Sequence, residues 1–172
     1  DNPVDNQNMI TDNKLRELVN KKVFNRKDLN TPITKEDLLQ VKDLFLNTNE
    51  ILDYSALKYM PNLKSLTVAN AKIKDPSFFA NLKQLSHLAL RGNEFSDVTP
   101  LVKMDHLDSL DLSNNKITNV TPLTEMKNVK SLYLSGNQIE DVTALAKMEQ
   151  LDYLNLANNK IKNVAPLSAL KK

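Results

Sequence analysis

Residues 107–126 read L-D-S-L-D-L-S-N-N-K-I-T-N-V-T-P-L-T-E-M. Apolar residues recur at fixed intervals in this stretch, and Leu107, Leu110, Leu112 and Ile117 form the series, with Asn115 as its polar member. The same series returns every 22 residues, so that units begin at positions 41, 63, 85, 107, 129 and 151. Six copies of one short unit indicate a chain in which each unit buries its apolar face against its neighbours.

Positions in each unit are counted here from its first residue. Positions 4 and 6 are apolar and alternate with polar neighbours, which is the periodicity of a strand with one buried face. These residues are Leu44 and Leu46, Leu66 and Val68, Leu88 and Leu90, Leu110 and Leu112, Leu132 and Leu134, and Leu154 and Leu156. The strands of successive units are expected to lie parallel, about 4.8 Å apart.

The second half of each unit is not expected to form a regular helix. Proline at position 16, as in Pro100, Pro122 and Pro166, rules out a long helix there and favours short 3₁₀ turns. The whole pattern resembles the leucine-rich repeat. It predicts an α/β solenoid, a curved leucine-rich repeat with a parallel sheet on its concave side, short 3₁₀ turns on its convex side and an N-terminal α-helical cap.

Position 9 is asparagine in five of the six units. These residues are Asn49, Asn93, Asn115, Asn137 and Asn159. A buried amide must be satisfied, and this one can bond the backbone where the chain leaves the strand and bends. The stacked units therefore predict a structural row of asparagines, which we call the asparagine ladder. Ala71 interrupts the ladder in the second unit, where the backbone must be satisfied in another way.

Position 13 is aspartate or asparagine in every unit. The residues are Asp53, Asp75, Asp97, Asn119, Asp141 and Asn163. A row of acids could hold calcium, whose ligands are oxygens. Aspartate and asparagine are also the natural caps of a short helical turn, because their side-chain oxygens accept from free backbone amides. Capping is the interpretation favoured here.

The first 40 residues differ from the repeats. Residues 1–10 are mainly polar and are expected to form a flexible leader. Residues 11–40 are predicted to form a helical cap, with one helix over about 12–24 and a second over about 35–40. Thr34 and Asp37 have the spacing of a capping box at the start of the second helix. Such a cap would cover the apolar end of the first repeat.

Residues 41–172 form the six repeats, and no capping sequence follows the sixth. The last unit would then expose its apolar side chains, at a cost of roughly 1.5–3 kcal/mol for each one. This edge suggests that the protein continues beyond residue 172, or that a partner or a second copy contacts it end to end. In the irregular second unit, Phe78 stands where proline is usual, which suggests packing against the cap or a secondary contact site.

Composition excludes several classes of function. The net charge is +2 with charges of both signs interspersed, so that no basic stripe for nucleic acid is expected. There is no cysteine, which excludes disulfides, thiolate nucleophiles and cysteine metal sites. With two glycines in 172 residues, glycine-rich phosphate loops are absent. No apolar run approaches the length of a membrane span, so direct membrane insertion is not expected.

The repeats resemble those of the internalins, surface proteins of Gram-positive bacteria. The resemblance rests on D-V-T-P-L at 97–101 and N-V-T-P-L at 119–123, with N-V-A-P-L at 163–167, and on a helical cap joined directly to the first repeat. Residues 141–145 read D-V-T-A-L and depart at the proline. The likeness covers about residues 10–172. Intracellular 22-residue repeat proteins, such as phosphatase regulatory subunits, are the nearest competing relatives and usually lack this T-P-L step.

The internalin resemblance implies an extracellular or cell-surface protein whose curved sheet binds another protein, often on a host cell. The immunoglobulin-like region, wall anchor and export signal of that family are not among these residues. Cell-surface localisation is therefore an expectation from the resemblance alone.

Positions 3, 5 and 7 of each unit are expected to face a partner on the concave sheet. Most are small or polar, and a few stand out by size or charge. The predicted partner-binding residues are Phe45, His87, Arg91, Asp111, Tyr133, Tyr153 and Asn155. Aromatic residues and arginine dominate interface energies. The alternative is an ordinary solvated face, on which Phe45 could pack under the cap.

An enzyme can also be constructed from this face. His87, Ser109 and Asp111 would lie on adjacent strands and are the members of a nucleophilic triad. A stacked sheet offers no oxyanion hole and no strained elbow for the serine. His106 is expected at a solvated turn, and two separate histidines do not make a zinc site. No catalytic residue, metal or cofactor is therefore predicted.

The sequence predicts a protein-binding module that acts by rigid display, because a preformed sheet binds without the cost of folding. Two alternatives remain. The repeats could be a spacer that holds a downstream domain away from the cell, or an intracellular regulator of a partner enzyme. Aromatic and charged side chains on the concave face favour binding, whereas a bland face favours a spacer, and this face is intermediate.

Overall fold

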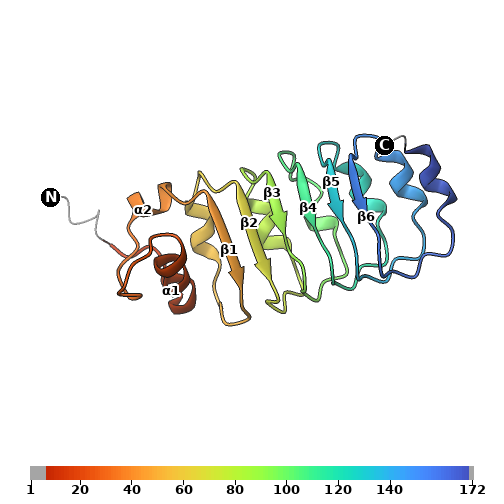
Figure 1. The fold of residues 1–172 in the computed structure, drawn as a ribbon. Coiled ribbons are helices and arrows are strands. Elements are labelled where there is room, and N and C mark those ends of the chain that lie inside the picture. The colour runs from red at the N-terminus through yellow and green to blue at the C-terminus, as the bar shows by residue number, and fades with distance from the viewer. Residues whose placement is uncertain (1–6, 171–172) are drawn as a thin grey trace.

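Six parallel strands in chain order form one sheet in the computed structural model, which describes residues 7–170. The strands are β1 (Asp43–Asn47), β2 (Ser65–Ala69), β3 (His87–Ala89), β4 (Ser109–Asp111), β5 (Ser131–Tyr133) and β6 (Tyr153–Asn155). Each strand pairs with the next at an offset of 22 residues, as Leu66 does with Leu88. Equal positions of successive units therefore lie side by side across the sheet (Figure 1).

A short 3₁₀ turn follows each strand on the opposite side of the solenoid (Figure 1). The turns are η1 (Ser55–Tyr59), η2 (Ser77–Asn81), η3 (Thr99–Leu101), η4 (Thr121–Glu125), η5 (Thr143–Lys147) and η6 (Ala165–Ala169). With the N-terminal helices, this arrangement confirms the predicted leucine-rich repeat solenoid. The core is one continuous cluster that runs through the units, as stacked units require.

The asparagine ladder joins each coil to the coil before it. Asn137 donates its Nδ2 to Leu112 O (3.0 Å) of the preceding coil, and also to Leu134 O (3.0 Å) and Ser135 O (3.3 Å) of its own. Its Oδ1 accepts from Ile117 N (3.0 Å) of the preceding coil. Asn93 and Asn159 repeat this arrangement. Asn115 donates in the same way, but its buried Oδ1 accepts no hydrogen bond within residues 7–170.

Asn49 departs from the predicted ladder. It is exposed, and its side chain makes no hydrogen bond to the described residues. The reason is geometric. Each ladder asparagine bonds backbone groups of the preceding coil, and the first coil has no coil before it.

At this end of the solenoid, Asp12 of the cap bonds backbone amides of the first coil. Its Oδ2 accepts from Leu52 N (2.8 Å) and Asp53 N (3.0 Å). These amides lie close to the backbone groups that an asparagine at position 71 would bond if the ladder were not interrupted by Ala71. Its Oδ1 accepts from Leu15 N (2.9 Å) and caps the first helix. One carboxylate thus ties the cap to the first coil.

The N-terminal cap contains α1 (Asn13–Lys22) and α2 (Lys35–Leu39). Thr34 and Asp37 form the predicted capping box. Arg26 was not predicted to contribute, yet it bonds Asn20 Oδ1 (3.0 Å) and Asp37 Oδ1 (3.0 Å). Burial opposes charge on Asp37, but bonds from the Thr34 amide and from Arg26 hold its pKa below the usual value. Asn20 is fully buried and donates to two carbonyls of the connecting loop.

The predicted leader is too long. Ile10 is fully buried, and Met9 N donates to Ile33 O (2.7 Å). Asn8 Oδ1 accepts from Ile33 N (3.1 Å), so residues 8–10 lie along the loop before α2. An apolar pair, Met9-Ile10, next to the cap carried this signal in the sequence. Residues 1–6 of the predicted leader lie outside the described residues.

Phe78 is half-buried and packs against Tyr54 and Phe79. Tyr54 belongs to the first coil, and burial raises the pKa of its hydroxyl.

At the C-terminal end of the solenoid, four apolar side chains are only partly buried against the core: Leu154, Leu156, Ile161 and Leu167. Val164 is 64% exposed. The sixth coil therefore presents an apolar edge, as its sequence predicts.

Three position-9 variants test the asparagine ladder. Asn137→Ala removes a side chain that satisfies groups of two coils, and we expect it to lower the free energy of unfolding by about 1–3 kcal/mol. Asn115→Ala should cost less than Asn137→Ala, because its Oδ1 has no partner to lose. Asn49→Ala is the matched control and should stay within about 0.5 kcal/mol of the parent. Urea unfolding followed by circular dichroism measures all three, and equal costs would contradict the ladder.

Candidate functional site

The outward sheet face consists of the residues at positions 3, 5 and 7, of which Ala69 and Ser113 at position 7 are buried. In β1 the strand alternates, with Leu44 and Leu46 buried and Asp43, Phe45 and Asn47 exposed. The middle of the face is lined with small side chains from β2 to β5. They are Ser65, Thr67, Ala69, Ala89, Ser109, Ser113, Ser131 and Ser135. The exceptions in the middle are His87, Arg91 and Asp111, and the aromatic side chains of the face lie on β1, β5 and β6.

Tyr133 and Tyr153 form an aromatic pair at the C-terminal end of the face. Tyr133 lies on β5 and Tyr153 on β6, and the register places them diagonally. Their ring centroids are 4.9 Å apart with a 37° tilt. Tyr153 is 47% exposed, which is high for so large a side chain. The pair therefore offers a broad aromatic surface, with each ring already held by the other.

Phe45 forms the other end of the face together with the cap. It is 46% exposed, and Lys22 of α1 places its Nζ 5.3 Å from the ring centroid. Both residues line a shallow hollow between the cap and the first two strands. Phe45 therefore meets the cap through Lys22 and stays 46% exposed. Sequence spacing could not reveal this cation–π pair, since the orientation of α1 was unknown.

Arg91 and Asp111 lie in the middle of the face, and Arg91 Nη1 is 3.9 Å from Asp111 Oδ2. Asp111 also accepts from Ser113 N (3.0 Å). Asn155, at the same position two units later, likewise accepts from Ala157 N (3.0 Å). Asp111 and Asn155 thus help their own strands to end, and only part of their polar capacity faces solvent.

The members of the hypothetical triad do not bond one another. His87 and Ser109 are register partners on β3 and β4, but His87 Nδ1 pairs with Ser86 Oγ (2.9 Å). Asp111 is occupied by Arg91 and by the Ser113 amide. Within residues 7–170 no hydrogen bond connects the three side chains, so the structure does not assemble them as a triad.

The position-13 residues act as caps. Each accepts a hydrogen bond from the backbone amide two residues later, as Asp97 does from Thr99 N (2.9 Å) and Asn119 from Thr121 N (3.0 Å). Hydroxyl bonds from Ser77, Thr99 and Thr143, with the amides of the same residues, hold the pKa values of Asp75, Asp97 and Asp141 below their usual value. The Ser55 amide is the main cause of the lowered pKa of Asp53.

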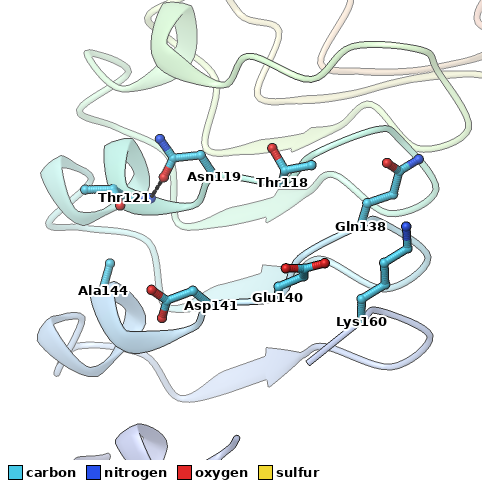
Figure 2. Close-up of a pocket in the computed structure, with 8 residues that line it drawn as sticks. All are labelled: Thr118, Asn119, Thr121, Gln138, Glu140, Asp141, Ala144 and Lys160. Carbon is cyan, nitrogen blue, oxygen red and sulfur yellow. Dashed lines mark hydrogen bonds between the residues drawn. The ribbon is translucent and has the colours of Figure 1, made fainter. Parts of the chain in front are cut away.

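A hollow beside η4 and η5 contains Glu140, Asp141 and Lys160 (Figure 2). Asp141 caps η5, and no ion pair connects Lys160 to either acid in the described chain.

Nowhere in residues 7–170 do three or more histidine, aspartate or glutamate side chains gather as metal ligands would. The same residues contain no helix long and apolar enough to cross a membrane.

Comparisons with known proteins identify the repeats. A family model described as leucine rich repeat matches residues 105–161, and one described as leucine rich repeats in two copies matches residues 83–125. The fold is similar to that of an internalin, inlF, from Listeria monocytogenes, with 29% identity and a TM-score of 0.68 over 78% of this chain. A leucine-rich repeat protein of Leptospira interrogans is similar at 25% identity, with a TM-score of 0.67 over 81%.

Internalin C2 of Listeria monocytogenes also shares the fold. It is 22% identical with a TM-score of 0.67, and the match covers 95% of this chain and 91% of that one. By contrast, this chain spans 39% of the inlF chain and 37% of the Leptospira chain. A comparison with curated proteins finds no match.

The position-13 aspartates predict a loss of stability in acid. Because their folded pKa values are lowered, their stabilisation is complete above the pKa of an unfolded aspartate, about 3.9, and is lost as the pH falls through the folded values. We expect the melting temperature to drop as the pH is lowered below about 4. Asp75→Asn with Asp97→Asn, which copies Asn119 and Asn163, should flatten this dependence. An unchanged pH profile in the double variant would contradict the assignment.

Proposed function

Because this chain is an internalin-like leucine-rich repeat protein, we propose that it is an exported module that binds a protein partner on its outward sheet face. The observation that supports the proposal is the Tyr133–Tyr153 pair, in which Tyr153 is 47% exposed and Tyr133 partly exposed on the sheet face. The leucine-rich repeat fold is typical of modules for protein–protein interaction. Such modules generally act without catalysis, and we propose no enzymatic activity here.

The outward sheet face is suited to a protein by its size and rigidity. Phe45 and Tyr153 lie on the first and sixth strands, and five steps of about 4.8 Å separate them by roughly 24 Å. This span is that of a protein surface rather than of a small ligand. The strands are held by backbone bonds and by the asparagine ladder, so that little ordering is needed on binding.

The ends and the middle of the face have different roles in this proposal. Aromatic anchors that bury large areas supply most of the binding energy at interfaces. Here they are Phe45 with Lys22 at one end, and Tyr133 with Tyr153 at the other. The small side chains between them allow close approach, and the exposed Arg91 adds a charged contact whose geometry Asp111 helps to fix. His87 and Asn155 would contribute polar contacts at the edges of these clusters.

Location on the bacterial surface or outside the cell, and a host factor as the partner, are inferences from the likeness to internalins. Fractionation of the native organism tests the first inference. Recovery of this chain only from the cytosol would favour the intracellular regulator of a partner enzyme instead.

A structural spacer remains the second candidate function. The small side chains across the middle of the outward sheet face favour it, because a spacer needs no specific contacts there. The two functions differ in the effect of the aromatic residues, since a spacer should be indifferent to them.

Tyr133→Ala combined with Tyr153→Ala tests the binding proposal. A photo-reactive phenylalanine at Ser131, between the two tyrosines on the sheet face, should cross-link a partner from the surface of its target cells. We expect the double variant to lose this product by tenfold or more, in line with the loss of about 2 kcal/mol or more at an interface hot spot. Unfolding should change by less than about 1 kcal/mol, since both rings are partly exposed.

Tyr59→Ala is the matched control, because Tyr59 is 56% exposed on η1, away from the sheet face. It should leave cross-linking unchanged. A double variant that cross-links as well as the parent would overturn the sheet-face proposal, and would leave the spacer as the better reading.

A further inference from the structure

A second row of amides runs along the turns that lead into the strands. It uses position 22, the last residue of each unit. Gln84 Nε2 donates to Met60 O (3.1 Å) and Gln150 Nε2 to Met126 O (2.9 Å). Asn62 and Asn128, with shorter side chains, donate to the carbonyl one position later, which is Leu39 O (2.6 Å) at the end of α2 and Asp105 O (2.7 Å). Each of these amides ties its turn to the preceding coil.

His106 interrupts this row. It stands at position 22 between Gln84 and Asn128, whereas four of the six units have an amide there and the sixth has Lys172. The imidazole is exposed and makes no hydrogen bond to any described residue. His106 therefore takes no part in the hydrogen bonds by which the neighbouring amides hold their turns, and an amide would serve this position better.

The unpaired imidazole lines a hollow with only cationic and neutral polar neighbours. The lining residues are Lys64, Lys83, Gln84, Ser86 and His106. Lys64 Nζ reaches only a backbone carbonyl, Gln84 O, at 3.4 Å. Neither lysine belongs to an ion pair within residues 7–170. No carboxylate lines this hollow, so the two ammonium groups and the imidazole have no internal counter-charge there.

Charges of both signs lie on the other side of His106. The adjoining hollow is lined by Asp105, Asp108, Lys127 and Lys130. Its acids and bases balance in number, and its chemistry differs from that of the Lys64–Lys83 side. Only the first hollow concentrates positive charge next to the free imidazole.

We propose that the hollow formed by Lys64, Lys83, Ser86 and His106 binds a tetrahedral oxyanion, a sulfate or phosphate group. The site is separate from the outward sheet face, although Ser86 links the two through its contact with His87. Two ammonium groups and a protonated imidazole supply charge-assisted donors to such an anion. Ser86 and Gln84 also line the rim, where Ser86 Oγ donates to Lys64 O (3.2 Å) and Gln84 Nε2 to Met60 O (3.1 Å).

Histidine makes the site responsive to pH. Its side chain is the one that commonly changes charge between about pH 5 and 8, whereas lysine stays charged throughout this range. Asp105 and Asp108 line the adjoining hollow together with His106. Binding of an anion that does not itself titrate should therefore strengthen as the pH falls.

Inorganic sulfate is the first probe, because its charge is constant over this range. Calorimetric titration at constant ionic strength should show saturable binding, about five- to tenfold tighter at pH 5.5 than at pH 8. His106→Gln copies Gln84 and Gln150, and so removes the charge while restoring the row of amides. We expect this variant to keep its melting temperature, to bind sulfate about five- to tenfold more weakly at pH 5.5, and to lose the pH dependence.

Lys83→Gln should weaken sulfate binding at both pH values, and Lys116→Gln, at position 10 far along the repeat from this turn, is the matched control. Inorganic phosphate and methyl sulfate form two further arms, which separate a free ion from an ester group carried by a larger molecule. Absence of saturable binding, or equal affinities of the parent and His106→Gln at pH 5.5, would overturn the proposal. So would a loss of equal size in Lys116→Gln.

Discussion

The hydrogen bonds of the asparagine ladder hold the rest of this structure in place. Each ladder amide satisfies carbonyls where its own strand ends and reaches back to the coil before it. Unmet backbone groups at these bends would be costly, because the bends lie against an apolar core. Each coil is consequently docked at one position on its neighbour, and the 22-residue offset is kept across all five strand pairs. The outward sheet face inherits its regular spacing from this constraint.

The solenoid could be predicted from the sequence because periodicity alone determines it. Six equal units with apolar residues at the same positions have one economical arrangement, in which neighbours bury each other. The ends of the solenoid could not be predicted in this way, because each end residue meets an environment that the repeat does not define. Asn49 shows this, since it matches the repeat but lacks the preceding coil that would bind it. Asp12 shows the converse, since it lies outside the repeat and yet satisfies the first coil.

The candidate site was predictable to a similar degree. Register places Tyr133 and Tyr153 on adjacent strands, so that their proximity follows once the repeat is aligned. The partner of Phe45 could not be deduced, because Lys22 approaches from a helix whose packing angle is set by the whole cap. Arg26 was missed for the same reason, as it bonds Asn20 of α1 and Asp37 of α2, which lie 6 and 11 positions away. His106 was visible as an irregularity only after the row of position-22 amides had given it a context.

The direction of the ladder bonds also bears on how this protein folds. A ladder amide can be satisfied only when the preceding coil is already in place, and the first coil is completed by Asp12 from the cap. An assembly that starts at the cap would satisfy each ladder amide as its coil docks, in the order in which a ribosome delivers the chain. Each new coil can settle on a finished template without waiting for residues still to be made. A solenoid built in this way is suited to vectorial folding. Its cap then provides the first folded template, besides covering the apolar end of the first coil.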